Sequence, residues 1–175
     1  MESHCLFLYK DINTLRKSYS KYCNRALIKS NEIVLILSYT DSIQDTFVTL
    51  SNTDIDVKNF KDEGSLVIVE SRKGFYGMLD RFVGISIMVK MLLQRVEKLQ
   101  KNGLMVISDM GLFFHLDRIE DLIVYEKQIS KSVSKLNVRV ICAYSMPDFI
   151  SLSEEQKRLL ESTHDTISSL DLEVS

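Results

Sequence analysis

The residues of this chain that could do chemistry are few and far apart. His4 and Cys5 are adjacent, Cys142 lies near the other end of the chain, and the other histidines are His115 and His164. Adjacent side chains of a strand point to opposite faces of the sheet, so His4 and Cys5 cannot both bind one ion. No Cys-x-x-Cys pair is present either. This spacing predicts no metal site, and a catalytic Cys–His pair could form only between residues distant in sequence. We therefore expect no catalytic residues.

Glu126 occupies a position that its helix should give to an aliphatic residue. The segment 119–133 has an apolar stripe at helical spacing, and position 126 falls on that stripe. A buried carboxylate must be paired, hydrogen-bonded or protonated. Two interpretations remain open. Glu126 is a structural residue that reaches an edge or pairs with an arginine such as Arg139, or it is a polar anchor in a ligand cavity. Its neighbour Tyr125 could contribute to either.

A phosphate-binding loop is absent from the place where it would be expected. Such a loop follows the first strand as GxxxxGK[ST], but the chain reads YKDINTLRKSYS there and has no glycine before Gly64. Nucleotide hydrolysis is therefore not expected. Asp109 ends an apolar strand, where phosphate-loop enzymes keep a Mg²⁺-binding aspartate. Without the loop, we interpret Asp109 as a residue that caps the next turn.

Strand-like and helix-like patterns alternate along the whole chain. Short apolar runs predict buried strands at residues 4–9, 33–37, 66–70, 104–108 and 138–144. Helical periodicity and capping residues predict helices at about 12–29, 42–50, 75–100, 115–136 and 153–164. Residues 168–175 could form an edge strand or a frayed end. We predict a single α/β domain over residues 1–175, a three-layer sandwich whose mostly parallel central sheet has helices on both faces.

A ligand pocket in such a fold is expected at the carboxyl ends of the strands. The residues expected on its floor are Tyr9, Asp109 and Tyr144, and Tyr39 is a further candidate at a strand end. Polar groups from the core, His4 and Glu126, are expected to reach it. A segment bracketed by glycines, GFYG, carries Tyr76 and precedes the longest helix. We interpret it as a segment that could order over the pocket when a ligand binds.

The composition excludes several classes of protein. The 175 residues are 45% hydrophobic and carry a net charge of −2 with a pI near 5.9, which does not favour a nucleic-acid binder. The most apolar segment, residues 82–93, is shorter than the about 20 residues that a membrane span needs. The start of the chain lacks the features of a signal peptide. The three cysteines have no framework spacing, and we expect reduced thiols in a cytoplasmic protein.

Several segments in a fixed order resemble the MEDS domain, a sensory domain of methanogens and methylotrophs. They are SHCLFLY, NEIVLIL, DIDVKNFKDEGSLVIVES, GFYG, VYEKQI and RVICAYSMPDF, followed by a helix that ends at His164. The resemblance covers about residues 3–165. It implies a RecA/KaiC-like core without the phosphate-binding loop, in an archaeal or bacterial protein. Members of the family are regarded as sensors of small molecules such as hydrocarbon derivatives.

The resemblance also implies which residues belong to the site. The positions that match recurring family residues are His4, Tyr9, Glu32, Tyr76, Tyr125, Glu126, Cys142, Tyr144 and His164. The chain departs from the family at Ser108-Asp109-Met110, where members often carry Gly-Glu-Met. Many members are fused to an output domain, and none is attached here. The signal is therefore expected to leave through a partner protein or through homo-oligomerisation.

Three functions remain open. The first is a non-catalytic small-molecule sensor in signal transduction or transcriptional regulation, with no cofactor, no direct contact with nucleic acid and no membrane association. The second is a ligand-free protein-interaction module on a degenerate ATPase fold. The third and least favoured is a residual nucleotide-binding ATPase.

Overall fold

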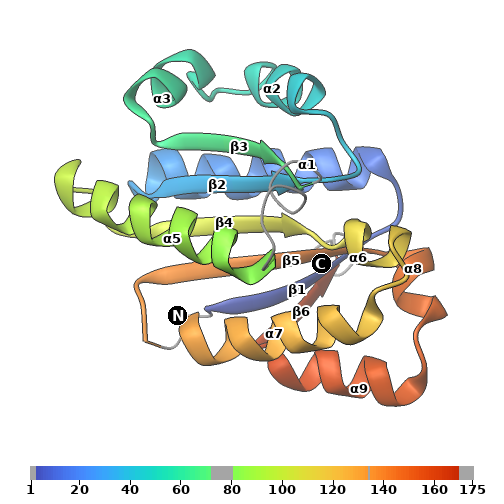
Figure 1. The fold of residues 1–175 in the computed structure, drawn as a ribbon. Helices are drawn as coiled ribbons and strands as arrows, with labels where there is room; N and C mark the ends of the chain where they lie inside the picture. The colour runs from blue at the N-terminus through green and yellow to red at the C-terminus, as the bar shows by residue number, and fades with distance from the viewer. Residues whose placement is uncertain (1–2, 72–80, 134, 170–175) are drawn as a thin grey trace.

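Six parallel strands form one sheet with helices on both faces (Figure 1). The computed structural model describes residues 3–71, 81–133 and 135–169. The strands are β1 (His4–Tyr9), β2 (Ile33–Ser38), β3 (Leu66–Glu70), β4 (Leu104–Asp109), β5 (Val138–Ser145) and β6 (Thr166–Ser169). Their order across the sheet is β3-β2-β4-β5-β1-β6, and every pairing is parallel. The predicted α/β class and the five predicted strands are confirmed.

The helices connect successive strands. They are α1 (Ile12–Asn24), which continues into a π-helical turn η1 (Arg25–Lys29), α2 (Ile43–Ser51), α3 (Val57–Glu63), α5 (Arg81–Lys98), α6 (Gly111–His115), α7 (Ile119–Val133), α8 (Met146–Ser151) and α9 (Glu154–Thr163). The N-cap residues Asp11, Ser42 and Ser153 each accept a backbone N–H of the first turn of their helix. Ser153 and Gln156 also form a capping box at the start of α9.

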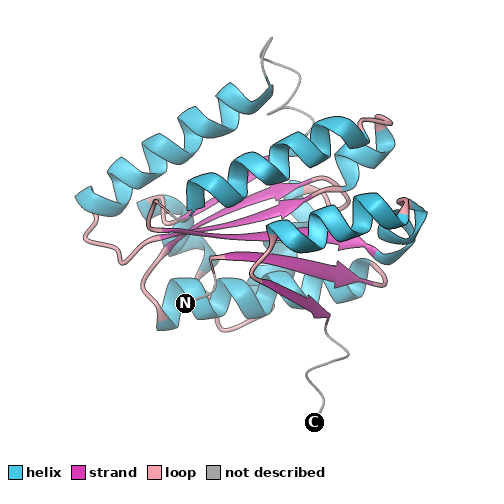
Figure 2. Cartoon of the chain, turned by 90° about the horizontal axis from the view of Figure 1, so that it is seen from below, coloured by secondary structure: helices cyan, strands magenta, loops and turns pink. Residues whose placement is uncertain are grey.

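Two separate hydrophobic cores lie on the two faces of the sheet. Helices α5, α7 and α9 cover one face, with Leu92, Leu122 and Leu160 in its core. Helices α1, α2 and α3 pack with the opposite face, where Leu15 and Leu50 are buried. The view from below shows the sheet between the two layers of helices (Figure 2). Strand β2 is buried along its whole length, which explains its continuous apolar sequence.

The helix predicted at 115–136 is shorter in the structure, where α7 spans Ile119–Val133 and a separate short helix precedes it. Helix α6 ends at His115 and α7 begins at Ile119, and between them Asp117 has a φ of 52°, which a continuing helix does not allow. Three short helices, α3, α6 and α8, were not predicted. Pro147 does not simply close strand β5: it lies in the first turn of α8, after the N-cap Ser145.

Two predicted segments, 75–100 and 168–175, lie only partly within the described residues. Helix α5 occupies the described part of the helix predicted at 75–100, and the part before residue 81 lies outside the described residues. Strand β6 pairs with β1 at the edge of the sheet, so the edge-strand interpretation holds for Ser168 and Ser169, and residues 170–175 lie outside the described chain.

Candidate functional site

Asp109 at the end of β4 holds together a closed group of polar side chains. Its carboxylate accepts backbone N–H groups of Thr40 and Gly111 at 2.8 and 3.0 Å. The Tyr9 hydroxyl lies 3.5 Å from Asp109 Oδ1 and 3.1 Å from the Thr40 hydroxyl. Burial raises the pKa of Asp109, and the N–H donors oppose that rise. The interpretation of Asp109 as a cap of the following turn is confirmed.

A short connection leads directly from β1 into α1 at the position where a phosphate-binding loop would lie. Only Lys10 and Asp11 separate β1 from α1. The Asp11 carboxylate accepts the backbone N–H of Thr14 at 2.8 Å. The N-terminus of α1, which in phosphate-loop proteins faces the nucleotide, therefore faces a carboxylate of its own chain.

Tyr39 lies beside the Asp109 group rather than inside it. Its ring centroid is 5.8 Å from that of His115, and it packs over Gly111, where a Cβ would come within 2.8 Å of the Tyr39 ring. Gly111 thus allows the close approach of Tyr39. Tyr76 lies outside the described residues.

The residues expected on one pocket floor divide between the two faces of the sheet. The register pairs Tyr9 with Ser145 and Leu8 with Tyr144, so Tyr9 and Tyr144 point to opposite sides. Tyr9 belongs to the core beside α1, and Tyr144 belongs to the core beside α7. The expected polar residues of the core, His4 and Glu126, lie on the side of Tyr144.

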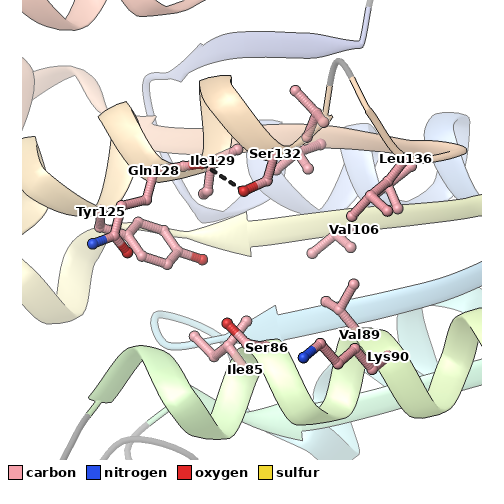
Figure 3. Close-up of a pocket in the computed structure, with 13 residues that line it drawn as sticks. Ile85, Ser86, Val89, Lys90, Val106, Tyr125, Gln128, Ile129, Ser132 and Leu136 are labelled. Atoms are coloured by element: carbon pink, nitrogen blue, oxygen red, sulfur yellow. Dashed lines mark hydrogen bonds between the residues drawn. The ribbon is translucent and has the colours of Figure 1, made fainter.

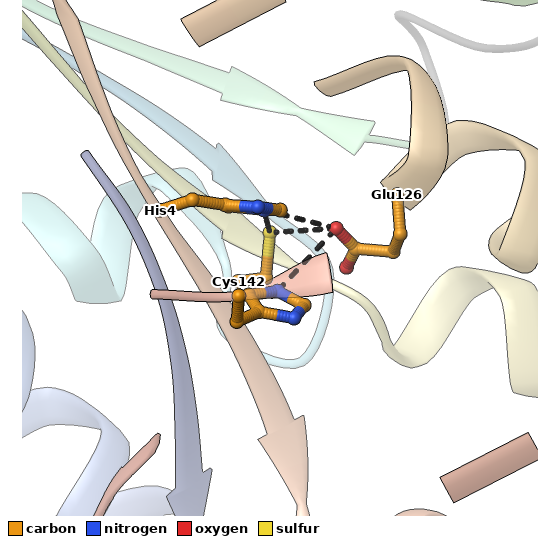
Figure 4. A group of neighbouring side chains, drawn as sticks. His4, Glu126 and Cys142 are labelled. Carbon is orange, nitrogen blue, oxygen red and sulfur yellow. Dashed lines mark hydrogen bonds and ion pairs between the residues drawn. The ribbon is translucent and has the colours of Figure 1, made fainter. Parts of the chain in front are cut away.

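His4, Glu126, Cys142 and His164 form a buried cluster (Figure 4). Nε2 of His4 lies 3.1 Å from Oε2 of Glu126, and Nε2 of His164 lies 3.4 Å from the same oxygen. The Cys142 thiol lies 3.4 Å from both Glu126 Oε2 and His4 Nε2. The Tyr144 hydroxyl donates a hydrogen bond to the other carboxylate oxygen, Oε1. The side chains of the cluster are screened from solvent almost completely.

The contacts within this cluster favour the ionised form of Glu126. Burial alone would raise the pKa of Glu126, but the contact with His4 and the nearby His164 outweigh it and hold that pKa below its ordinary value. Burial lowers the pKa of His164 and raises the pKa of Cys142 and Tyr144. The site therefore contains a carboxylate, a thiol and a neutral His164 imidazole at neutral pH.

The expected structural pairing of Glu126 with Arg139 is wrong. Arg139 instead makes two hydrogen bonds to the carboxylate of Glu32, with Nε at 3.1 Å from Oε1. Glu126 is fully buried and does not reach an edge of the domain. Its partners come from β1, β5 and the end of α9, which are distant from it in sequence.

A cavity of about 230 Å³ lies between α5 and α7, over strands β4 and β5 (Figure 3). Val106, Val138 and Val140 line it on the sheet side. The helices contribute further lining residues, namely Ile85, Ser86, Val89 and Lys90 from α5 and Tyr125, Gln128, Ile129, Ser132 and Val133 from α7, with Leu136 beyond it. Of the residues expected in the site, Tyr125 lines this cavity, and the adjacent Glu126 belongs to the buried cluster.

The cavity does not lie at the carboxyl ends of the strands, where a pocket was expected: Val138 begins β5 and Val106 lies in the middle of β4. Most residues of the cavity were therefore not anticipated. Gln128 and Ser132 are four residues apart and therefore share one side of α7 with Tyr125. This polar spacing beside an apolar stripe is the signal that could have indicated a lined cavity. His164 was recognised only as a family-like position, and the structure brings it to Glu126.

The model of the family "MEDS: MEthanogen/methylotroph, DcmR Sensory domain" matches residues 3–165. The chain belongs to the MEDS family. Membership of this family indicates a sensory role in signalling. No curated protein matches the chain. In the part of the chain that the structure describes, no helix combines the length and apolar character needed to cross a membrane.

The fold of this MEDS chain is that of KaiC-like proteins. The crystal structure of a KaiC-like protein from the hyperthermophilic archaeon Pyrococcus horikoshii superposes with a TM-score of 0.63 over 96% of this chain and 73% of the other, at 12% identity. The RecA/KaiC-like architecture expected for the MEDS chain is confirmed. At this identity the similarity concerns the fold and not the activity.

Proposed function

We propose that this MEDS chain is a non-catalytic sensor that binds a small, largely apolar molecule between α5 and α7. The observation that carries the proposal is the cavity of about 230 Å³, which is lined mainly by valine and isoleucine side chains. Ligand sites are typically apolar cavities with a few polar groups that orient the ligand. This volume suits a molecule of a few heavy atoms rather than a nucleotide.

The polar groups of the lining indicate the chemistry of the ligand. Lys90 comes from α5, and Gln128 and Ser132 come from α7 on the opposite wall (Figure 3). These groups can hydrogen-bond to one polar or polarisable substituent, while Val106 and Ile129 contact the hydrocarbon part. A short hydrocarbon derivative with a single polar end fits this arrangement.

The lining supports binding rather than catalysis. Its ionisable residues are Lys90 and Tyr125. Burial raises the pKa of Tyr125 further above its ordinary value, so its hydroxyl stays protonated and acts only as a hydrogen-bonding group. Nucleophilic catalysis requires a nucleophile paired with a base, and the described lining residues do not supply such a pair.

Helix α5 is the element through which we expect the signal to leave. Its inner residues line the cavity, whereas Ile87 and Met91, four residues apart on the outer side, are 45% and 64% exposed. A ligand that changes the position of α5 would alter this apolar pair, which suits contact with a partner protein or a second copy of the chain. The ligand acts through its different affinity for the two positions.

A thermal-shift screen with short alkanes, chlorinated alkanes and alcohols tests the proposal. A ligand that binds the folded chain raises its melting temperature, and the gain grows with the logarithm of the ratio of ligand concentration to dissociation constant. Ser86 is an exposed residue of α5 that lines the cavity. The variant Ser86→Trp should therefore place an indole in the cavity and abolish the shift. Ile87→Trp is the matched control, because residue 87 lies next on the same helix but does not line the cavity.

The outcomes separate the candidate functions. A shift in the wild type and in Ile87→Trp, lost in Ser86→Trp, supports the sensor. A screen without any shift, combined with a partner or dimer that forms equally well in the wild type and in Ser86→Trp, would instead support the ligand-free interaction module.

A further inference from the structure

Four potential metal ligands converge in the core, away from the cavity between α5 and α7. Nε2 of His4 and His164, Sγ of Cys142 and a carboxylate oxygen of Glu126 all lie within 4.8 Å of one another. The contacts between neighbouring ligand atoms measure 3.1 to 3.4 Å. Bonds of about 2.0–2.3 Å at tetrahedral angles place ligand atoms about 3.3–3.8 Å apart. Four of the six separations are thus close to those of a tetrahedral site, while the other two are at most 4.8 Å, so the ligands would need to close by up to about 1 Å around one ion.

The hydrogen bonds that both imidazoles make through Nδ1 leave their Nε2 atoms, which face Glu126, available as metal ligands. Nδ1 of His4 lies 2.9 Å from the carbonyl oxygen of Thr163, and Nδ1 of His164 lies 2.7 Å from that of Leu160. A carbonyl only accepts, so each Nδ1 carries a proton, and Nε2 of a neutral ring then presents a lone pair. These lone pairs face the Glu126 oxygen, and Nε2 of His164 is buried with no hydrogen-bond partner. A cation between these atoms would satisfy all of them.

The surroundings of the cluster resemble the second layer of contacts around bound metals. Metal-binding histidines usually donate their other N–H to a carbonyl or carboxylate, as His4 and His164 do here. The Tyr144 hydroxyl fixes the carboxylate of Glu126 through Oε1 and leaves Oε2 directed at the other ligands. The carbonyls of Leu160 and Thr163 belong to the C-terminal turn of α9, whose negative end favours a cation.

We propose that His4, Glu126, Cys142 and His164 bind one divalent transition-metal ion of the zinc class. Two imidazoles, one thiolate and one carboxylate form the mixed set that suits Zn²⁺, whereas Mg²⁺ and Ca²⁺ require oxygen ligands. Binding releases the thiol proton of Cys142 to solvent. The ion with its thiolate, carboxylate and two neutral imidazoles then carries no net charge, which suits a fully buried position. This departs from the expectation of no metal site, which considered only neighbouring residues.

The metal ion would link elements from the beginning and the end of the chain. Its ligands come from β1, α7, β5 and the residue after α9 (Figure 4). With four protein ligands no coordination position stays open, which is the pattern of structural rather than catalytic zinc. The ion would join the first strand to the last helix, and its binding free energy would add to the stability of the fold.

Metal analysis of the full chain tests this inference independently of the sensory ligand. The chain is loaded with Zn²⁺, passed through a desalting column and analysed for metal, and we expect one ion to remain per chain. Replacement by Co²⁺ should give the intense visible absorption of a tetrahedral site and a near-ultraviolet charge-transfer band from the Cys142 thiolate. Cys142→Ser should lose that band and lower the zinc affinity by at least 100-fold.

A second cysteine provides the matched control. Cys23 is also fully buried but lies in the core on the other face of the sheet, so Cys23→Ser should keep the full zinc content and the cobalt spectrum. The inference is overturned if the desalted wild type holds no zinc and shows no thiolate-to-cobalt band, which would leave a buried imidazolium–carboxylate pair. It is equally overturned if Cys142→Ser binds zinc as tightly as the wild type. Should Cys142→Ser fail to fold, the cobalt spectrum of the wild type alone decides.

Discussion

Nε2 of His4 lies 3.1 Å from Oε2 of Glu126, and this contact joins the first strand of the sheet to α7 in a position closed to solvent. Glu126 is followed along α7 by the residues that line the cavity, and it is preceded by Tyr125, which lines the cavity itself. The polar cluster and the apolar cavity therefore share one helix. A change in either site can reach the other through the position of α7.

Tyr144→Phe should weaken zinc binding without removing a ligand. The variant deletes the hydroxyl that orients Glu126, and loss of such an outer contact typically costs about 10–100-fold in metal affinity. Competition with a chromophoric chelator measures the change. Tyr22→Phe, at the other face, is the control. Equal affinities of Tyr144→Phe and wild type would contradict the role given to this hydroxyl.

Asp109→Asn should change how stability depends on pH. Burial raises the pKa of Asp109 in the folded chain above the ordinary 3.8, so the folded state binds this proton more tightly than the unfolded state. The resulting stabilisation is complete below the unfolded pKa and is lost as the pH rises through the folded pKa. Relative to Asp109→Asn, the wild type should therefore lose free energy of unfolding as the pH increases from about 4.

Glu63→Gln should change the pH dependence of stability in the opposite direction to Asp109→Asn. Hydrogen bonds from Lys101 and Ser65 lower the pKa of Glu63, so the wild type should lose stability relative to Glu63→Gln on acidification. Urea unfolding of the three proteins across pH measures both differences. Parallel curves for Asp109→Asn and the wild type would show that Asp109 titrates as it does in the unfolded chain.

Arg139→Met should destabilise the domain because it leaves the carboxylate of Glu32 largely buried without its partner. Breaking such a pair costs up to about 3 kcal/mol, whereas replacing both partners by apolar residues costs much less. The double variant with Glu32→Met should thus be more stable than Arg139→Met alone. Lys157→Met, which breaks a pair with the exposed Glu154, should change stability by less than about 1 kcal/mol.

Ser153→Ala tests the capping box that starts α9, the helix whose end holds His4 and His164. The variant removes the side-chain acceptor of the Gln156 N–H, and loss of a serine cap costs about 1 kcal/mol. Ser162→Ala, at an exposed position in the last turn of the helix, should cost less than about 0.5 kcal/mol. Equal free energies of unfolding for the two variants would contradict a stabilising role of the cap.

Local patterns in the sequence were sufficient for the sheet and for most helices. Continuous apolar runs such as residues 33–37 predicted buried parallel strands, and capping residues such as Asp11 located helix starts. The break before α7 was not predicted from the sequence, because it depends on Asp117 adopting a left-handed conformation that a non-glycine residue rarely takes. Helix α8 was not predicted, because a proline directly after a strand indicates the end of that strand as readily as the first turn of a helix.

The candidate sites depended on tertiary contacts that no local pattern contains. Position 126 was recognised as anomalous from its helical stripe, yet its partners at positions 4, 142 and 164 are set by strand order and by the end of α9. The cavity depends on the distance between α5 and α7, which neither helix encodes alone. Of the expected site residues, the structure brings together His4, Glu126, Cys142 and Tyr144, and places Tyr9 with Asp109 elsewhere.

A crystal structure of the wild type under xenon pressure tests the central claim most directly, because xenon occupies apolar cavities that can receive small molecules. The account predicts a xenon atom between α5 and α7, in contact with Val106 and Ile129, and none in the Ser86→Trp variant. A wild-type structure in which side chains fill this space and xenon binds only elsewhere would contradict the proposed sensor site.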